Sequence, residues 1–345
     1  MRFLIVKTSA LGDIVQTYPV LQYLKQRFPD AEIDWIVEKQ NAELVSSHPY
    51  ISRTLYAQTK EWRKLKKLNE FLEFRKQLQA FEYDAVFDLQ GNFKSGLLTF
   101  LAKSKHKIGF AWKDAPEWPN IFFTNKRYSL PPGANIRQDY LFLTKSFFDD
   151  KESFEILGVP LKTTEEQRTQ IEKTLNNPLL QGRKRVMVCP GSAWPNKQMR
   201  EEAIATMLQS LHQRSRCAFL FVWGTQEERD VCLRLQQQFP RQGILLERMH
   251  LPALQHCMGH MDLVVAMDSL PLHLAGSAGV ATFSVFGASS AKKYNPLGTQ
   301  HVAVQGACPY GRTFDKRCPI LRTCPTGACI RSLTGNEKDL IISLE

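Results

Sequence analysis

The first half of the chain alternates short apolar runs with longer segments of helical type. The apolar runs are near-continuous and of strand type; they cover residues 2–6, 33–37, 54–57, 84–90 and 107–110. Helix-compatible segments such as YPVLQYLKQRF, residues 18–28, separate several of them. Strands that are apolar on both faces are typical of parallel sheets covered by helices on both sides. The pattern therefore predicts a doubly wound α/β domain.

The second half repeats this organisation. Strand-type runs cover residues 185–192, 217–224, 243–249, 263–269 and 281–287, with helical segments such as residues 200–214 and 227–239 between them. Residues 158–185 are polar and contain no such run, so we interpret them as the connection between two domains. We predict an α/β protein with two Rossmann-like domains, residues 1–165 and residues 166–345.

The segment after the first predicted strand, KTSALGD, is a turn with one glycine and one carboxylate, Asp13. It lacks the G-x-G-x-x-G fingerprint of dinucleotide-binding folds. In open α/β sheets, ligands bind outside the carboxyl ends of the strands. Small and polar residues follow most of the predicted strands: Thr8, Ser9, Gly12 and Asp13; Gln90 and Lys94; Ser192 and Lys197; Gly224, Glu227 and Glu228; Asp268, Ser269 and His273. Their recurrence predicts a ligand cleft between the two domains.

Composition and charge narrow the class of partner. Hydrophobic residues make up 43% of the chain and charged residues 23%, which is ordinary for a globular protein with a real core. The formal net charge of +11 favours anionic partners such as nucleotides, phosphorylated glycolipids or an acidic membrane surface. No apolar run of about 18 residues occurs, and Asp13 interrupts the first apolar segment where a signal peptide would continue. We expect a cytoplasmic protein with mostly reduced cysteines.

Four stretches, taken in order, carry a family resemblance. VKTSALGDIVQTYPVL resembles the opening motif of the lipopolysaccharide heptosyltransferases, glycosyltransferase family 9. YDAVFDLQGNFKS, PGSAWPNKQMREE and MDSLPLHLAGSAGVATFSVFGASS resemble later blocks of that family, so the resemblance extends from residue 1 to about residue 331. It implies the GT-B architecture, in which two Rossmann-like domains face each other across a cleft. It also implies inverting, metal-independent transfer of heptose from ADP-heptose to the lipopolysaccharide inner core.

Two residues fit the catalytic chemistry that the resemblance implies. An inverting transfer needs one carboxylate to deprotonate the attacking hydroxyl, and Asp13 follows the first predicted strand on the ligand side. The alternative is that Asp13 only caps the next helix. Lys197 matches the family's catalytic lysine and would neutralise the departing diphosphate as a point charge. The alternative for Lys197 is a solvated surface lysine.

Most of the other strand-end residues are interpreted as the site for the ADP-sugar. Asp268-Ser269 precedes a Pro-Leu-His sequence that should open a helix, whose backbone N–H groups would bind phosphate oxygens. Glu227 or Glu228 is expected to accept hydrogen bonds from the ribose, as the family's glutamate near this strand end does. Leu270 stands where the family usually has glycine, which allows close backbone approach. The expected donor-binding set is Thr8, Ser9, Gly12, Ser192, Gly224, Glu227, Glu228, Asp268, Ser269, Leu270 and His273.

A basic segment, residues 60–76, carries seven basic and three acidic residues, with apolar residues at near-helical spacing. The spacing predicts an amphipathic helix. The resemblance places it in the N-terminal, acceptor-binding domain. We expect Arg63 and Lys64, together with Gln90 and Lys94, to contact an anionic acceptor, lipid A–Kdo or a partial core oligosaccharide. The alternative is a helix that only packs its apolar stripe on the first domain.

The eight cysteines fall into two groups. Cys189, Cys217, Cys232 and Cys257 lie in strand or helix patterns and are expected to be buried thiols. Cys308, Cys318, Cys324 and Cys329 lie within 22 residues, a density that could bind zinc, but their spacing lacks the paired C-x-x-C of a strong zinc motif. A structural zinc and a metal-free segment, reduced or disulfide-bonded, both remain open. We expect no catalytic metal and no required cofactor.

Three other functions fit parts of the sequence. A GT-B transferase that uses another nucleotide sugar would share the same motifs. A basic chain could bind nucleic acid, but its basic residues are interleaved with acidic ones and no RRM, zinc-finger or KH signature appears. A nicotinamide dehydrogenase would need the missing glycine fingerprint. We expect a monomer at the inner face of the inner membrane, in transient contact with anionic lipid and without a nucleic-acid partner.

Overall fold

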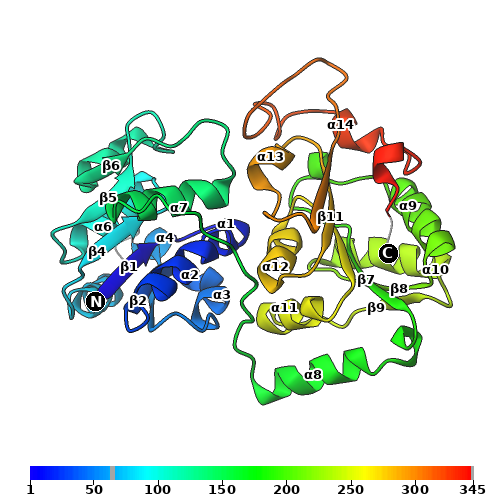
Figure 1. The fold of residues 1–345 in the computed structure, drawn as a ribbon, viewed down its shortest axis with the longest axis horizontal. Coiled ribbons are helices and arrows are strands. Elements are labelled where there is room, and N and C mark those ends of the chain that lie inside the picture. The colour runs from blue at the N-terminus through cyan, green and yellow to red at the C-terminus, as the bar shows by residue number, and fades with distance from the viewer. Residues whose placement is uncertain (63–66, 343–345) are drawn as a thin grey trace. The chain divides into compact units, whose positions relative to one another are not determined.

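The computed structural model describes residues 1–62 and 67–342, and in it the chain forms two compact units, Met1–Leu157 and Gly158–Glu345. In each unit helices cover a six-stranded sheet whose strands pair in parallel (Figure 1). The predicted pair of doubly wound α/β units is confirmed.

The first unit has the strand order β3-β2-β1-β4-β5-β6. Its strands are β1 (Arg2–Val6), β2 (Glu32–Glu38), β3 (Arg53–Ala57), β4 (Ala85–Asp88), β5 (Lys107–Phe110) and β6 (Lys126–Tyr128). Its helices are α1 (Leu11–Val15), α2 (Tyr18–Arg27), α3 (Ala42–Ser46), α4 (Thr59–Trp62), α5 (Leu68–Leu78), α6 (Phe93–Leu101) and α7 (Ile136–Phe147), with the 3-10 turns η1 (Lys39–Asn41) and η2 (Trp118–Phe123).

The second unit has the strand order β12-β11-β10-β7-β8-β9. Its strands are β7 (Lys184–Cys189), β8 (Cys217–Phe221), β9 (Gly243–Leu245), β10 (Leu263–Met267), β11 (Thr282–Phe286) and β12 (His301–Gln305). Its helices are α8 (Glu165–Leu175), α9 (Glu201–Arg214), α10 (Gln226–Gln238), α11 (Leu251–Gly259), α12 (Leu270–Ala278), α13 (Ala291–Tyr294) and α14 (Ala328–Arg331), with the 3-10 turns η3 (Pro178–Leu180), η4 (Pro195–Lys197) and η5 (Lys338–Leu340).

The two sheets share one topology. If β7 is counted as the first strand of its own unit, both sheets read 3-2-1-4-5-6, the order of Rossmann folds. In such sheets the chain reverses its direction of winding between strands 1 and 4, and ligands bind at the carboxyl ends of the strands there. The positions to inspect are therefore the ends of β1 and β4 in the first unit and of β7 and β10 in the second.

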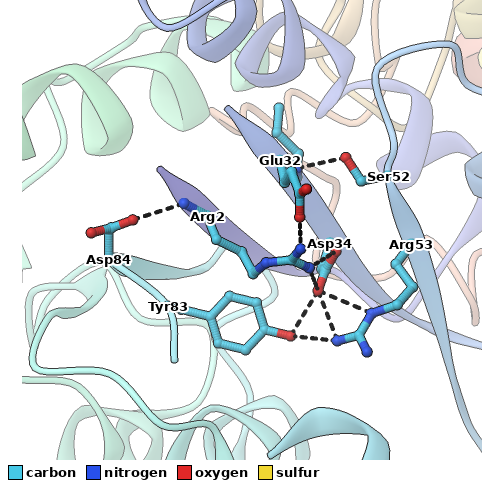
Figure 2. A network of polar contacts seen from close by, with 8 residues as sticks. Arg2, Glu32, Asp34, Ser52, Arg53, Tyr83 and Asp84 are labelled. Carbon is cyan, nitrogen blue, oxygen red and sulfur yellow. Dashed lines mark hydrogen bonds and ion pairs between the residues drawn. The ribbon is translucent and has the colours of Figure 1, made fainter. Parts of the chain in front are cut away.

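The core of the first sheet contains a buried ion cluster as well as apolar side chains. Asp34, on β2, is fully buried and receives Arg53 at 2.8 Å, the Tyr83 hydroxyl at 2.9 Å and Arg2 at 3.1 Å (Figure 2). Because every oxygen of a buried carboxylate must be compensated, this cluster ties β1, β2, β3 and the start of β4 together.

The limits of the sequence pattern appear at the sheet edges. The strands β6 and β12 were not predicted; both are edge strands with exposed or half-buried positions, so neither has a continuous apolar run. The residues predicted to connect the domains contain α8, which packs on α11 of the second unit (Figure 1). No helix among the described residues is both long and apolar enough to cross a membrane.

The prediction of a single helix over residues 60–76 is wrong. α4 and α5 are separate helices, and Lys67, which precedes α5, has a non-helical backbone. Trp62 packs on Phe74, but Leu72 is exposed, so the apolar stripe is only partly covered. Arg63 and Lys64 lie outside the described residues.

Candidate active site

The ends of β1 and β4 are joined by the side chain of Gln90. Its Oε1 atom accepts hydrogen bonds from the backbone N–H groups of Thr8 and Ser9, each at 3.1 Å. It also lies 3.4 Å from the Thr8 hydroxyl. One amide oxygen thus holds the loop that follows β1, and the structure brings these three predicted residues together.

Asp13 lies in the first turn of α1, the helix that follows the loop held by Gln90. Its Oδ2 atom accepts a hydrogen bond from the Ala10 backbone N–H at 3.3 Å, and the residue is half-buried. This is the helix-capping contact that the sequence left as an alternative. A carboxylate has about four lone-pair sites, so this single contact leaves room for Asp13 to accept a proton as well.

Gly12 and Lys94 complete the predicted residues of this edge. Gly12 is half-buried in α1. Lys94 is half-buried in the first turn of α6, which follows β4 after a short loop and begins with Asn92 as its N-cap.

Asp88, the last residue of β4, holds the loop that follows this strand. It was not among the predicted site residues. Its oxygens accept hydrogen bonds from the N–H groups of Gln90 and Gly91 at 3.1 and 2.9 Å, from the Ser95 hydroxyl at 2.9 Å and from the Asn120 amide at 2.6 Å. Burial raises the pKa of Asp88, because these neutral donors only partly compensate the loss of solvent. The side chain therefore fixes the β4 loop through neutral donors.

The second edge is built around Asp268, which follows β10. Its Oδ2 atom receives the Lys197 ammonium at 2.5 Å and the hydroxyl of Ser289, and its Oδ1 atom lies 3.6 Å from His273 Nε2. All four side chains are buried. The alternative of a solvated surface lysine is therefore wrong for Lys197.

The contacts of Asp268 with His273 and Lys197 set the electrostatics of this edge. Burial opposes ionisation of Asp268, but the His273 hydrogen bond and the Lys197 charge outweigh it and hold the pKa of that carboxyl well below its ordinary value. Asp268 is therefore a carboxylate at neutral pH and orients the Lys197 ammonium, which has three N–H donors and gives one to Asp268.

The segments on either side of Asp268 follow the prediction locally. Ser192, which follows β7, donates to the Asp268 backbone carbonyl at 3.2 Å. Ser269 is the N-cap of α12, and Leu270 is the first helical residue, so the Pro-Leu-His sequence does open a helix. The N–H groups of its first turn need partners from outside the helix.

After β8, the two adjacent glutamates have different surroundings. Glu228 forms a capping box with Thr225, and its Oε2 atom accepts from the Gly224 N–H at 2.7 Å. Glu227 is exposed at the start of α10. The geometry thus engages Glu228 in the turn and leaves Glu227 facing solvent.

Asp88 and Ser289 were not predicted as site residues, although the position of each at the end of a strand could have indicated them. Asp88 ends the strand that pairs with β1, and Ser289 follows β11, which pairs with β10. Both therefore stand at the same sheet edges as the predicted residues. Among the described residues, no group of three or more His, Cys, Asp or Glu side chains is arranged to hold a metal ion.

Comparisons with known proteins identify the family and the fold. A family model described as glycosyltransferase family 9 (heptosyltransferase) matches residues 71–323. Lipopolysaccharide heptosyltransferase 1 of Pseudomonas aeruginosa is 26% identical over 324 residues, which cover 92% of this chain and 87% of that protein. The E. coli heptosyltransferase WaaC with ADP matches with a TM-score of 0.74 and 25% identity, over 89% of this chain and 94% of that one.

The same E. coli enzyme with ADP-2-deoxy-2-fluoro heptose matches with a TM-score of 0.70, also at 25% identity and with the same coverage. The family model spans well over half of the chain and includes the ends of β4, β7, β8 and β10. With its two six-stranded parallel sheets, which match the GT-B fold, the chain belongs to glycosyltransferase family 9, the heptosyltransferases.

Proposed function

We propose that this transferase moves a heptose from ADP-heptose to the lipopolysaccharide inner core, with inversion at the anomeric carbon and without a divalent metal ion at the reacting centre. The observation that carries the proposal is the buried group of Lys197, Asp268 and His273 at the ends of β7 and β10. It supplies fixed positive charge in a family whose E. coli member is seen with ADP and with an ADP-heptose analogue.

In the proposed donor site, the diphosphate approaches Lys197 and the first turn of α12. Lys197 places an ammonium where the leaving group develops charge, and the N–H groups that follow Ser269 donate to phosphate oxygens. The Leu270 side chain projects from this turn, so phosphate contact relies on N–H groups rather than on the close approach that glycine allows. Glu227 accepts from the ribose hydroxyls because Glu228 is engaged in capping α10. Ser192, Gly224 and His273 complete this part of the site, and Thr8, Ser9 and Gly12 contact the donor from the first unit.

In the proposed reaction, Asp13 is the general base. The acceptor hydroxyl attacks the anomeric carbon on the face opposite ADP, its proton passes to Asp13, and the bond from that carbon to the diphosphate oxygen breaks. ADP leaves with the electron pair, and Lys197 stabilises the resulting charge. The Ala10 contact supports this role because it fixes the orientation of the carboxylate.

The acceptor contacts are proposed on the first unit, at Gln90 and Lys94. The Gln90 oxygen is engaged by the β1 loop, so its amide Nε2 is the group offered to sugar hydroxyls. Arg63 and Lys64 are proposed from the sequence to dock the anionic acceptor. Their double replacement by alanine should raise the apparent KM for the acceptor and flatten its salt dependence, with the donor KM unchanged. A loss of thermal stability alone would assign the segment to packing.

A peripheral membrane contact is supported by an aromatic patch on the first unit. We use this name for the exposed rings of Phe93, Phe100, Trp112, Trp118 and Phe122 on and beside α6 and η2. Between ring centroids, Trp118 lies 5.6 Å from Trp112 in a tilted arrangement and 5.9 Å from Phe122 in an edge-on one. Aromatic side chains beside lysines are suited to the interface of an acidic bilayer.

The patch can be tested by vesicle sedimentation. Trp118→Ser with Phe122→Ser should lower binding to phosphatidylglycerol-containing vesicles, while Val302→Ser, which replaces an exposed apolar residue of the second unit, should not. Equal binding by the two variants would contradict the membrane contact.

The proposed activity is tested by a donor and acceptor screen in which sugar transfer is followed by mass spectrometry. ADP-heptose with a Kdo-terminated lipid A acceptor should give a product heavier by one heptose, with inverted configuration. Transfer from a different nucleotide sugar only would overturn the heptose assignment and favour another GT-B specificity. Addition of EDTA should cause no loss of rate that magnesium or manganese restores; such a loss would contradict metal independence at the reacting centre.

A further inference from the structure

One loop of the second unit carries chemistry that the transfer reaction does not use. Between β12 and α14, residues 306–327, the structure has no helix or strand. Cys308, Cys318 and Cys324 lie in this loop and Cys329 follows in α14; we call these four residues the cysteine cluster. All four line a single pocket, and all four are partly buried. The fold thus gathers thiols whose spacing in the sequence does not suggest a common site.

Two of the four cysteines share a local motif, Cys-Pro-x-Gly, at residues 308–311 and 324–327. Both glycines have a positive φ, 68° at Gly311 and 57° at Gly327, which glycine adopts without steric cost. The Gly311 N–H donates to the Cys308 carbonyl at 3.1 Å, and the Gly327 N–H donates to the Cys324 sulfur at 3.4 Å. Turns that aim backbone N–H groups at a sulfur orient and stabilise a thiolate ligand.

The surroundings of the pocket select for a thiophilic ion. Its described lining contains no carboxylate and no imidazole, so its anionic donors are sulfurs. All-sulfur donor sets favour zinc or iron over magnesium and calcium.

The loop also buries few apolar side chains that could stabilise it. Most of its residues are exposed, and Leu321 is its one buried large apolar side chain among the residues that the structure describes. A segment of this length costs ordering free energy for every residue and gains little from burial. A central cross-link would compensate for that cost.

We propose that the cysteine cluster binds one thiophilic metal ion, zinc or iron, through its four thiolates. Binding forms four metal–sulfur bonds and releases the thiol protons. In the structure the sulfurs surround the pocket but do not form a metal-holding group among the described residues. Binding therefore requires the cysteine side chains to rotate inward.

The ion would position the candidate catalytic lysine, a consequence that rests on the proposed function. Asn196, the neighbour of Lys197 in η4, donates to the carbonyls of Leu321 at 2.8 Å and Cys324 at 3.1 Å. On the other side, the Cys318 N–H donates to the Ala288 carbonyl at 2.8 Å, next to the Ser289 that contacts Asp268. The cysteine loop is thus bonded directly to both segments that hold the Lys197–Asp268 pair.

The ion itself is tested without any activity measurement. Protein purified under reducing conditions without chelator should contain about one zinc or iron ion per chain by mass spectrometry of the elements. Cys324→Ala and Cys308→Ala should each reduce this content at least about tenfold. Cys257→Ala, which replaces a buried cysteine of α11 in the same unit, is the matched control and should leave it unchanged.

Three outcomes would overturn the metal site. These are metal-free protein whose four cluster thiols react freely with a thiol reagent, disulfides detected by intact mass, and a metal content that is the same in Cys324→Ala as in the parent. Replacement by cobalt provides a second readout, since thiolate–cobalt charge-transfer absorption should appear in the parent and in Cys257→Ala but not in the cluster variants.

The positioning consequence has its own readout. Cys324→Ala should bind ADP more weakly than the parent, by roughly the tenfold that loss of a metal's support typically costs, while Cys257→Ala binds normally. If metal binds but ADP affinity is unchanged in Cys324→Ala, the ion does not position Lys197. If the parent chain binds no ADP at all, the proposed function fails while the metal result stands.

Discussion

Asp88 and Asp268 occupy equivalent places in two sheets of the same topology, yet their surroundings differ in kind. Asp88 ends β4 and Asp268 follows β10, the fourth strand of each unit. Asp88 is held by neutral donors, including two backbone N–H groups, and burial raises its pKa. Asp268 contacts Lys197 and His273, and these hold its pKa low in spite of burial.

The difference shows that two sheets of one topology can have carboxyl-end edges with different electrostatics. Asp88, with its neutral donors, fixes a loop of the first edge, where the half-buried Asp13 is the carboxylate that we propose for catalysis. Asp268 instead keeps the Lys197 ammonium buried and oriented, which suits an anionic leaving group. Asp34 marks a third case, since Arg2 and Arg53 compensate it within the sheet itself (Figure 2).

The largest expected effect is at the first edge. Asp13→Asn should lower the transfer rate roughly 10²–10⁴-fold, because it removes the proposed general base, while ADP binding stays normal. The measurement is steady-state transfer alongside calorimetric ADP binding. Asp30→Asn, at an exposed site away from the strand ends, is the control. Normal turnover in Asp13→Asn would reduce Asp13 to the cap of α1 and remove the first edge from the chemistry.

The second largest effect is expected at Lys197, where the loss of transfer rate can be compared with the loss of ADP affinity. Lys197→Ala should lower the transfer rate by about 10²–10³-fold, the typical result of removing one group that stabilises transition-state charge. Affinity for free ADP should fall by less. Lys173→Ala, on the exposed face of α8, is the control. Equal losses of rate and of ADP affinity would mean uniform binding and would contradict the catalytic role.

The third prediction concerns how the contributions of Asp88 and Asp268 to folding stability depend on pH. Folding favours the protonated form of Asp88, so its contribution to stability is greatest below the ordinary pKa of 3.8 and declines as pH rises through its raised folded pKa. The contribution of Asp268 is present above 3.8 and is lost as pH falls through its lowered folded pKa.

Near neutral pH, Asp268→Asn should therefore cost about 3–5 kcal/mol of unfolding free energy, since it strands the buried Lys197. Asp88→Asn should cost about 1–3 kcal/mol through its unpaired donors. Denaturant titrations from about pH 3 to pH 7 should show the penalty of Asp268→Asn rising with pH and that of Asp88→Asn falling. Parallel trends would show that the two surroundings do not differ as described.

The smallest effect is expected at the third carboxylate. Tyr83→Phe removes one hydroxyl donor to Asp34 but leaves both arginines, so it should cost about 1 kcal/mol of unfolding free energy. Transfer kinetics should be unchanged, because the cluster lies at the amino ends of β1 and β3, whereas the candidate site lies at the carboxyl ends of the strands. A change in the transfer rate without a change in stability would show that the Asp34 cluster acts on the reaction rather than on folding.

The sequence by itself determined the two α/β units and most of the candidate site residues, since both depend on local patterns. Continuous apolar runs produce buried parallel strands, and the residues that follow them must lie at the sheet edge where ligands bind. Two of the four edge strands, β6 and β12, were not predicted, because a strand with one open side needs no continuous apolar run; β12 has only one buried position, at His301. The separate start of α5 at Leu68 was also not predicted, because periodicity does not report where a helix begins.

Only the tertiary structure decided which of these residues act on one another. Lys197 meets Asp268 across 71 positions and Gln90 meets Thr8 across 82, while adjacent Glu227 and Glu228 have different surroundings. The same is true of the cysteine cluster, whose irregular spacing carried no strong motif until the loop folded around one pocket. Strand pairing brings together residues that are far apart in the chain, and the surroundings formed in this way determine whether the pKa of a carboxyl group is raised or lowered.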